Sequence, residues 1–328
     1  MKRREFIALL GGAVASWPFA VRAQKTKPVI AILGSGAADA GSSKQQMSLL
    51  DGSLRELGLA QGQDYLFEIR WAGSDASRFA PLAAELLAVH PSAVVVSTNL
   101  AALAVQKLSW TVPIVGTGLN TPVAIGLAES LARPGGNIAG VATMSEDLEL
   151  KLFEMMRETV PGLRRVMLFT NPSNPSSQIM LDLLKGLAEK DRLAIEAVSV
   201  SAPADLDAAF AEMSRQPPGA VVVLSDNSLF ALADRITARA LALRVPTFGN
   251  FALPFVQAGA LLTYSRDPRE AFQGVARLLK KLLDGANPAE LPFEQPTKFN
   301  LFINLKTAKT LGIEIPPKLL ATADEVIE

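Results

Sequence analysis

The feature that most restricts the fold of this chain is a regular alternation of short apolar runs with longer amphipathic stretches. The apolar runs are brief, often β-branched and mostly end at Gly, Ser or Thr, which is typical of buried strands. They occupy residues 28–34, 92–97, 112–116, 165–170, 194–200, 219–225 and 245–249. The stretches between them carry apolar residues three or four positions apart, as helices with one buried face do. We expect such helices over residues 43–57, 77–89, 147–159, 176–190, 228–242 and 269–284.

This alternation predicts an α/β protein whose parallel sheets are covered by helices on both faces. Residues 64–71 (DYLFEIRW) alternate in polarity, which favours a more exposed strand. The chain has 328 residues, more than one hydrophobic core usually serves, so we expect two lobes.

The second half of the chain repeats the pattern of the first. Each half contains a Pro-led turn, an apolar strand, a polar pair and a helix: PSAVVVSTNLAALA from Pro91 and PPGAVVVLSDNSLFALA from Pro217. A Val-Pro strand follows each helix, VPIVGTG at 112–118 and VPTFGN at 245–250. A repeat of this period is too long for a solenoid unit and suits two related α/β lobes, with chance resemblance among similar strands as the alternative.

Polar residues follow the strands in both halves. In an open parallel sheet, ligands bind beyond the carboxyl ends of the strands, where helix N-termini present unpaired N–H groups. If the two lobes face each other, these turns line one cleft that can hold a small polar molecule. The expected ligand contacts are Ser35, Gly36, Thr98, Asn99 and Thr117 from the first half, and Asn171, Asp226, Asn227 and Asn250 from the second.

Asp226 has two compatible interpretations, because a carboxylate at a helix start can cap the helix and can also pair with a ligand ammonium. Thr98 and Ser35 can likewise cap helices or donate their hydroxyls to a ligand carboxylate. Four aromatic residues surround the turns of the second half, either as core residues or as an apolar wall against a ligand. These are Phe230, Phe248, Phe251 and Tyr264.

The sequence lacks the residue sets that common catalytic and metal sites need. His90 is the only histidine, there is no cysteine, and no G-x-S-x-G segment occurs. Gly34-Ser35-Gly36 begins a G-x-G-x-x-G pattern, but Asp39 stands at its sixth position, which weakens a dinucleotide interpretation. We therefore expect no catalytic residues, no metal and no cofactor.

The N-terminal segment MKRREFIALLGGAVASWPFAVRAQ is expected to be a signal peptide. Lys2, Arg3 and Arg4 precede an apolar region, and small side chains at Val21 and Ala23 predict cleavage after Ala23. The uncharged run over residues 6–21 is too short, and too interrupted by Gly and Pro, for a membrane span. The adjacent arginines resemble a twin-arginine export signal, with an ordinary Sec signal as the alternative.

Cleavage at this point would leave a free, monomeric periplasmic protein that is not embedded in the membrane. Removing residues 1–23 takes away four basic residues and one acidic residue, which leaves 28 basic and 31 acidic residues and a net charge of −3. A surface of that balance does not favour nucleic acid as a partner.

Three segments of the mature chain, together with the signal, resemble a known family. The segments are SLARPGGNIAGVAT (130–143), NPSNP (171–175) and the tail EQPTKFNLFINLKTAKTLGIEIPPKLLATADEVIE (294–328). They resemble the ABC-transporter substrate-binding proteins of the type I periplasmic fold. The resemblance implies two Rossmann-like lobes joined by three crossovers, here 28–142 plus 265–290 and 143–264 plus 291–328. It also implies partnership with a permease and an ATPase, and some relatives are linked to amino-acid uptake.

We therefore expect a periplasmic solute receptor of an ABC importer that binds a small polar molecule, for example an amino acid or an aromatic carboxylate, between its two lobes without breaking a bond. The chain reads Leu119-Asn120-Thr121-Pro122 where relatives often show Asp-Pro, so a carboxylate is replaced at that turn. The alternatives are a two-lobed enzyme acting on a sugar or nucleotide, and the ligand-sensing half of a regulator. LacI-type regulators share the architecture but carry a DNA-binding headpiece where this chain has its export signal.

Overall fold

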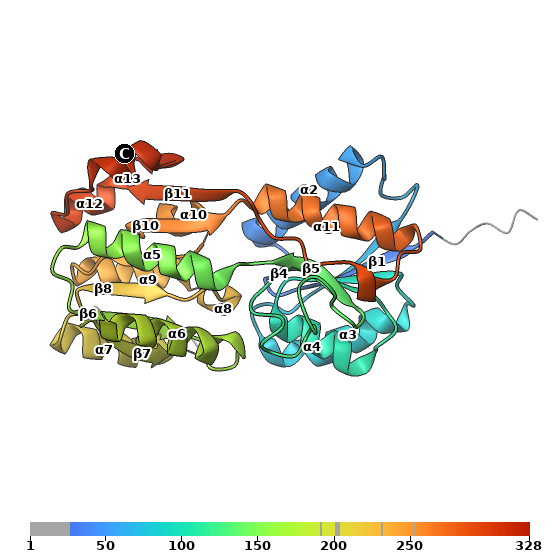
Figure 1. Cartoon of the computed structure of the whole chain (residues 1–328), viewed down its shortest axis with the longest axis horizontal. Coiled ribbons are helices and arrows are strands. Elements are labelled where there is room, and N and C mark those ends of the chain that lie inside the picture. The colour runs from blue at the N-terminus through green and yellow to red at the C-terminus, as the bar shows by residue number, and fades with distance from the viewer. Residues whose placement is uncertain (1–26, 191, 201–203, 231, 252) are drawn as a thin grey trace, which may run out of the picture.

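The computed structural model describes residues 27–328 apart from residues 191, 201–203, 231 and 252. The expected signal peptide and the cleavage site after Ala23 lie outside the described residues. The described chain forms two α/β lobes side by side, each built on its own sheet (Figure 1). The two expected Rossmann-like lobes are therefore present.

The first lobe contains a sheet of five parallel strands in the order β2-β1-β3-β4-β5. Its strands are β1 (Val29–Gly34), β2 (Leu66–Trp71), β3 (Ala93–Val96), β4 (Ile114–Leu119) and β5 (Ile138–Ala142). Its helices are α2 (Gly41–Glu56), η1 (Ala76–Arg78), α3 (Phe79–Ala88), α4 (Asn99–Leu108), α11 (Pro268–Leu283) and η2 (Pro288–Glu290). Figure 1 shows α2 and α11 on one face of this sheet and α3 and α4 on the other.

Alternation along the central strand explains why both faces are covered. Ile30 and Ile32 of β1 pack in the core beneath α2 and α11, whereas Ala31 and Leu33 pack in the core beneath α3 and α4. All four side chains are buried, so the strand is apolar throughout, as strands in a doubly covered parallel sheet are.

The second lobe contains a sheet of seven strands in the order β12-β11-β10-β9-β8-β6-β7. Its strands are β6 (Arg165–Thr170), β7 (Ala194–Ser199), β8 (Ala220–Val223), β9 (Thr247–Gly249), β10 (Leu262–Arg266), β11 (Phe299–Asn304) and β12 (Glu325–Ile327). Its helices are α5 (Ser145–Thr159), α6 (Ser176–Lys190), α7 (Asp205–Arg215), α8 (Asn227–Phe230), α9 (Ala233–Ala242), α10 (Leu253–Gln257), α12 (Leu305–Leu311) and α13 (Pro317–Thr322).

Two features of this lobe differ from the sequence-based expectation. The pairing of β10 with β11 is antiparallel, because the chain leaves β10 for the first lobe and returns to start β11 at the same end of the sheet. The expected helix over 228–242 is divided into α8 and α9, and Leu232 before α9 has a non-helical backbone.

Three chain segments cross between the lobes. The first joins β5 to α5 through Thr143 and Met144, and the second joins β10 to α11 through Asp267. The third follows η2 and leads into β11. It starts at Glu294, whose main-chain N–H donates to Gly140 O at 2.9 Å at the edge of the first sheet.

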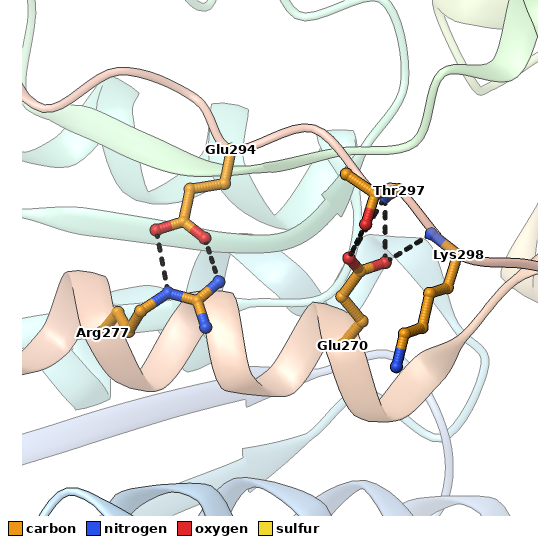
Figure 2. Close-up of polar contacts among 5 residues, drawn as sticks. All are labelled: Glu270, Arg277, Glu294, Thr297 and Lys298. Carbon is orange, nitrogen blue, oxygen red and sulfur yellow. Dashed lines mark hydrogen bonds and ion pairs between the residues drawn. The ribbon is translucent and has the colours of Figure 1, made fainter.

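The second and third crossovers are tied together by one carboxylate on α11. Glu270 accepts hydrogen bonds from the main-chain N–H groups of Thr297 and Lys298 and from the Thr297 hydroxyl (Figure 2). Burial alone would raise the pKa of Glu270, but these hydrogen bonds outweigh it and lower the pKa. Arg277, two turns further along α11, pairs with Glu294, so the returning crossover is held against this helix at two points.

The close approach of β4 and β5 generates a stability prediction. A Cβ atom on Gly140 would lie 2.6 Å from the carbonyl oxygen and 2.8 Å from the nitrogen of Gly116, which are main-chain atoms that cannot swing away. We expect Gly140→Ala to lower the free energy of unfolding in urea by about 1–3 kcal/mol. Gly186→Ala on α6 meets nothing within 4 Å and should raise that free energy by about 0.5–1 kcal/mol. A neutral Gly140→Ala would show that the two strands can separate freely.

Candidate ligand-binding site

A cavity of about 200 Å³ lies between the lobes, where the carboxyl ends of strands from both sheets meet. This position is the one that open parallel sheets use for ligands. The residues that line it are Gln46, Ser97, Thr98, Asn99, Gly118, Asn120, Thr143, Leu148, Asn174, Ser225, Asp226, Phe230, Asn250, Phe251, Ser265, Arg266 and Pro268. The set includes one carboxylate and one guanidinium.

Thr98 and Asn99 reach the cavity because they join β3 to the start of α4. The Thr98 hydroxyl accepts the Ala101 N–H at 3.1 Å and so caps the helix. Asn99 is buried, and its side chain brackets the turn after β4: Nδ2 donates to Asn120 O at 2.9 Å and Oδ1 accepts from Asn120 N at 3.1 Å. Asn99 therefore braces the neighbouring strand end at the cavity wall.

Asp226 lies between β8 and α8. It both caps the helix and lines the cavity, so the two interpretations of this residue are compatible. Its Oδ1 accepts from Leu229 N at 3.2 Å, which caps the short helix. The amides of Asn171 and Asn174 donate to its two oxygens at 3.2 and 3.0 Å. These donors hold the carboxylate in place beside the cavity.

Arg266, the last residue of β10, was missed by the sequence analysis. Its Nη1 donates to Thr117 O of the other lobe at 2.8 Å, and burial lowers its pKa to about 10. In the described part of the chain, no ion pair is formed by this guanidinium. A Cβ atom on Gly118 would lie 2.1 Å from Arg266 Nη2, so the glycine leaves the space that the guanidinium fills.

A local signal could have located Arg266. Asp267 caps α11 and Pro268 occupies its first turn, a common pattern at a helix start. Arg266, the residue before this helix cap, is the last residue of β10. The segment LTYSR, however, is too polar to stand out as a buried strand.

Asn120 connects the lobes at the turn after β4. Its Nδ2 donates to Ser225 O of the second lobe at 3.1 Å, and its Oδ1 accepts from Ser145 Oγ at 2.9 Å. Ser176 Oγ at the start of α6 donates to Asn120 O at 3.0 Å. A carboxylate at this position could not donate to Ser225, so the amide serves as a bridge that an aspartate would not provide.

Two of the four aromatic candidates lie at the cavity. Phe230 and Phe251 line it with their rings stacked, at 5.2 Å between centroids and 24° between planes. Phe248 is fully buried in the core of the second lobe, and Tyr264 stacks on Phe299 outside the cavity lining. The cavity therefore combines two opposite charges with an apolar aromatic wall.

Four further predicted contacts, Ser35, Gly36, Thr117 and Asn171, are not among the residues that line this cavity. Ser35 lines an adjoining hollow of about 30 Å³ that also reaches Thr98 and Asp226. Thr117 contributes its carbonyl to Arg266, and Asn171 is buried and acts on Asp226. Gly36 packs near Ser43, while the side chain of Asn227 lies outside the described residues. Ligand contact at all nine positions stays a prediction.

A cluster of unpaired polar side chains lies at the second lobe's side of the cavity. Glu149 on α5 is 1% exposed, Asn250 after β9 is 8% exposed and Ser265 on β10 is 3% exposed. Among the described residues, their side-chain N and O atoms have no hydrogen-bond partner. Burial raises the pKa of Glu149 to about 8; the nearby Asn250 amide and Ser225 main chain counteract the rise only partly.

Within the part of the chain that the structure describes, no group of three or more His, Asp or Glu side chains is placed to hold a metal ion. Within the same residues, no helix has the length and apolar character that a membrane span needs.

The family model of ABC transporter substrate binding proteins matches residues 38–327. This chain belongs to that family. It is 22% identical over 266 residues to the tyrosine-binding protein of Clostridioides difficile (strain R20291), covering 80% of this chain and 75% of that protein.

Solved structures of similar proteins support the fold. An ABC domain from Streptococcus pneumoniae in complex with L-Trp superposes with a TM-score of 0.84 at 22% identity, covering 92% of this chain and all of that one. The leucine binding protein LivK of Thermotoga maritima gives a TM-score of 0.60 at 15% identity, covering 79% and 82% of the two chains. The expected type I periplasmic binding protein fold is confirmed.

The buried acid in this substrate-binding protein generates a pH prediction. Because the pKa of Glu149 is about 8 in the folded state against 4.5 normally, the folded chain binds more protons between these values. Its contribution to the free energy of unfolding should therefore fall by roughly 1.4 kcal/mol per pH unit across that window. Urea unfolding at pH 5.5, 6.5 and 7.5 should show this slope in the wild type and not in Glu149→Gln. Glu158→Gln, exposed on the same helix, should retain it, and equal slopes in all three proteins would contradict the prediction.

Proposed function

We propose that this protein is the receptor of an ABC importer and that it binds a free amino acid with an aromatic or large apolar side chain between its two lobes. Closure of the lobe that carries β1–β5 onto the lobe that carries β6–β12 would present the ligand to a permease and an ATPase. The single observation that carries the proposal is the placement of Asp226 and Arg266 on one cavity that also has an aromatic wall.

The spacing of the two charges suits a zwitterion. Asp226 follows β8 and Arg266 ends β10, with β9 between these two strands. The ends of β8 and β10 therefore lie two strand spacings apart, which is about 10 Å. An amino-acid head group fits such a gap, with its ammonium toward Asp226 and its carboxylate toward Arg266. A ligand with both charges can pair with both residues, which offsets the desolvation of its own ammonium and carboxylate.

The remaining cavity supports an apolar side chain of moderate size. The stacked rings of Phe230 and Phe251 offer a flat surface for aromatic or aliphatic groups. A volume of about 200 Å³ lies below the range of drug-sized pockets and suits a metabolite of amino-acid size. The names of two relatives point the same way, since one is a tyrosine-binding protein and the other was solved with L-Trp.

We propose binding without chemical conversion. His90, the sole histidine, lies at a turn outside the cavity lining, so no imidazole is at hand to activate a nucleophile there. Family members are solute-binding proteins, which supports the same interpretation.

Calorimetric titration with the standard L-amino acids tests this function. We expect measurable binding that is tightest for aromatic or large apolar amino acids, and mass spectrometry should recover the ligand intact. Asp226→Asn and Arg266→Gln should each weaken binding by about 2–5 kcal/mol, because each leaves a ligand charge unpaired in the closed site. Arg269→Gln, on the exposed surface of α11, should bind like the wild type. Absence of binding to any amino acid, or unchanged affinity in both site variants, would contradict the proposal.

We also propose that the mature protein starts at Gln24 and works outside the cytoplasm, where substrate-binding proteins of ABC transporters are typically found. Intact-mass analysis of the protein from the periplasmic fraction should give the mass of residues 24–328. Replacing Arg3 and Arg4 with Lys should block export if the twin-arginine route is used, and should leave it unaffected on the Sec route. A full-length protein that stays in the cytoplasm would contradict export by either route.

A further inference from the structure

Three buried side chains without a hydrogen-bond partner among the described residues lie at or near the cavity. Asn250 and Ser265 line the cavity directly, and Glu149 lies next to the Asn250 amide on α5, which packs against β9 and β10. A buried polar group without a partner destabilises a fold by about 1–3 kcal/mol, so proteins seldom leave several together. Unpaired groups that face a cavity are the groups that a ligand can satisfy.

The strand order indicates which end of the ligand Asn250 and Ser265 face. Ser265 immediately precedes Arg266 on β10, and Asn250 follows β9, the strand between those of Arg266 and Asp226. Successive residues of a strand point to opposite faces, so Ser265 and Arg266 approach the cavity from different sides of β10. Asn250 follows the neighbouring strand, so a carboxylate held by Arg266 lies beside it, and Asn250 Nδ2 can donate a hydrogen bond there.

The charged groups around Glu149 do not favour its ionised form. Burial raises the pKa of Glu149, and the neutral Asn250 amide and Ser225 main chain lower it only partly. No charged side chain among the described residues contributes. On α5, Glu146 precedes it by one turn and carries the same charge; β9 has no titratable residue. On β10, Tyr264 and Arg266 flank Ser265, while the described titratable side chains of α6 are exposed. They are Asp182, Lys185 and Glu189.

A neutral Glu149 can orient the Asn250 amide. The Asn250 amide lies next to Glu149, where its N–H group lowers the pKa of the acid, and its side-chain oxygen is unpaired. A protonated Glu149 donates one hydrogen bond, which that oxygen can accept once the amide turns it toward the acid. When Asn250 Oδ1 accepts this proton, its Nδ2 is directed into the cavity. An ionised Glu149 would instead attract Nδ2, turn Oδ1 toward the ligand and add a negative charge behind it.

We propose that Glu149 is a positioning residue for the ligand carboxylate, which it serves in its protonated form by holding Asn250 with Nδ2 toward that carboxylate. This inference rests on the proposed amino-acid binding. Its consequence is that ligand binding takes up protons and weakens as pH rises. The sign is specific: an ammonium placed against Glu149 would favour the ionised acid and release protons instead.

Calorimetry of the wild type at pH 8, in two buffers with different ionisation enthalpies, measures proton exchange directly. With L-tryptophan or L-tyrosine as the probe, we expect uptake of about half a proton per bound ligand. Affinity should be roughly tenfold lower at pH 9 than at pH 7. Proton release, or no exchange beyond that of the amino acid itself, would overturn the role of Glu149.

Matched variants separate Glu149 from other titrating groups. Glu149→Gln should abolish the proton uptake and leave only the pH dependence that comes from the ligand ammonium. Glu158→Gln should reproduce the wild-type uptake, since this residue is exposed on the same helix. A shared pH profile in wild type and Glu149→Gln would also overturn the inference.

If no amino acid binds at pH 7, the proposed function itself fails; if binding occurs without proton uptake, only the role of Glu149 fails. The wild-type measurement decides between these outcomes even if Glu149→Gln does not fold.

Discussion

The interaction on which the two-lobed arrangement most depends is the hydrogen bonding of Asn120 at the end of β4. From this one turn, the side chain meets Ser225 and Ser145 of the second lobe, and the carbonyl meets Ser176. Every group in this connection is neutral. Hydrogen bonds of that kind contribute only about 0.5–1.5 kcal/mol each, so the lobes are held together by contacts that can be broken and remade. A receptor that must open and close needs a connection of this modest strength.

The charged residues complement this neutral connection. Asp226 is braced within its own lobe by the amides of Asn171 and Asn174, whereas Arg266 reaches across to Thr117 of the other lobe. A carboxylate bound by Arg266 would therefore strengthen a contact that already spans the two lobes. The free energy of ligand binding and that of lobe closure would then be coupled through a single guanidinium, as population shift by a ligand requires.

The sequence allowed prediction of the parts of the site that follow strong apolar strands. Thr98, Asn99, Asp226 and Asn250 stand directly after such runs, and all four line the cavity. Arg266 and Ser265 were missed because β10 is short and partly polar. Glu149 was missed for a different reason: it lies next to Leu148 and four residues before Phe153, within the buried stripe of α5. An acidic residue within an apolar stripe is a signal of a buried carboxyl group that the helix pattern alone does not interpret.

The crossovers and the cavity wall are adjacent in the chain, an arrangement that would let a bound ligand influence lobe movement in the proposed receptor. Thr143 lines the cavity and is followed by Met144, whose φ of 55° is unusual for a residue with a side chain. Arg266 lines it and is followed by Asp267, whose N–H donates to Lys298 O of the third crossover at 3.0 Å. Glu270 holds that same crossover. A ligand that fixed Thr143 or Arg266 would thus act on crossover residues without any intermediate element, so in the proposed receptor occupancy of the cavity and the relative position of the lobes would be coupled.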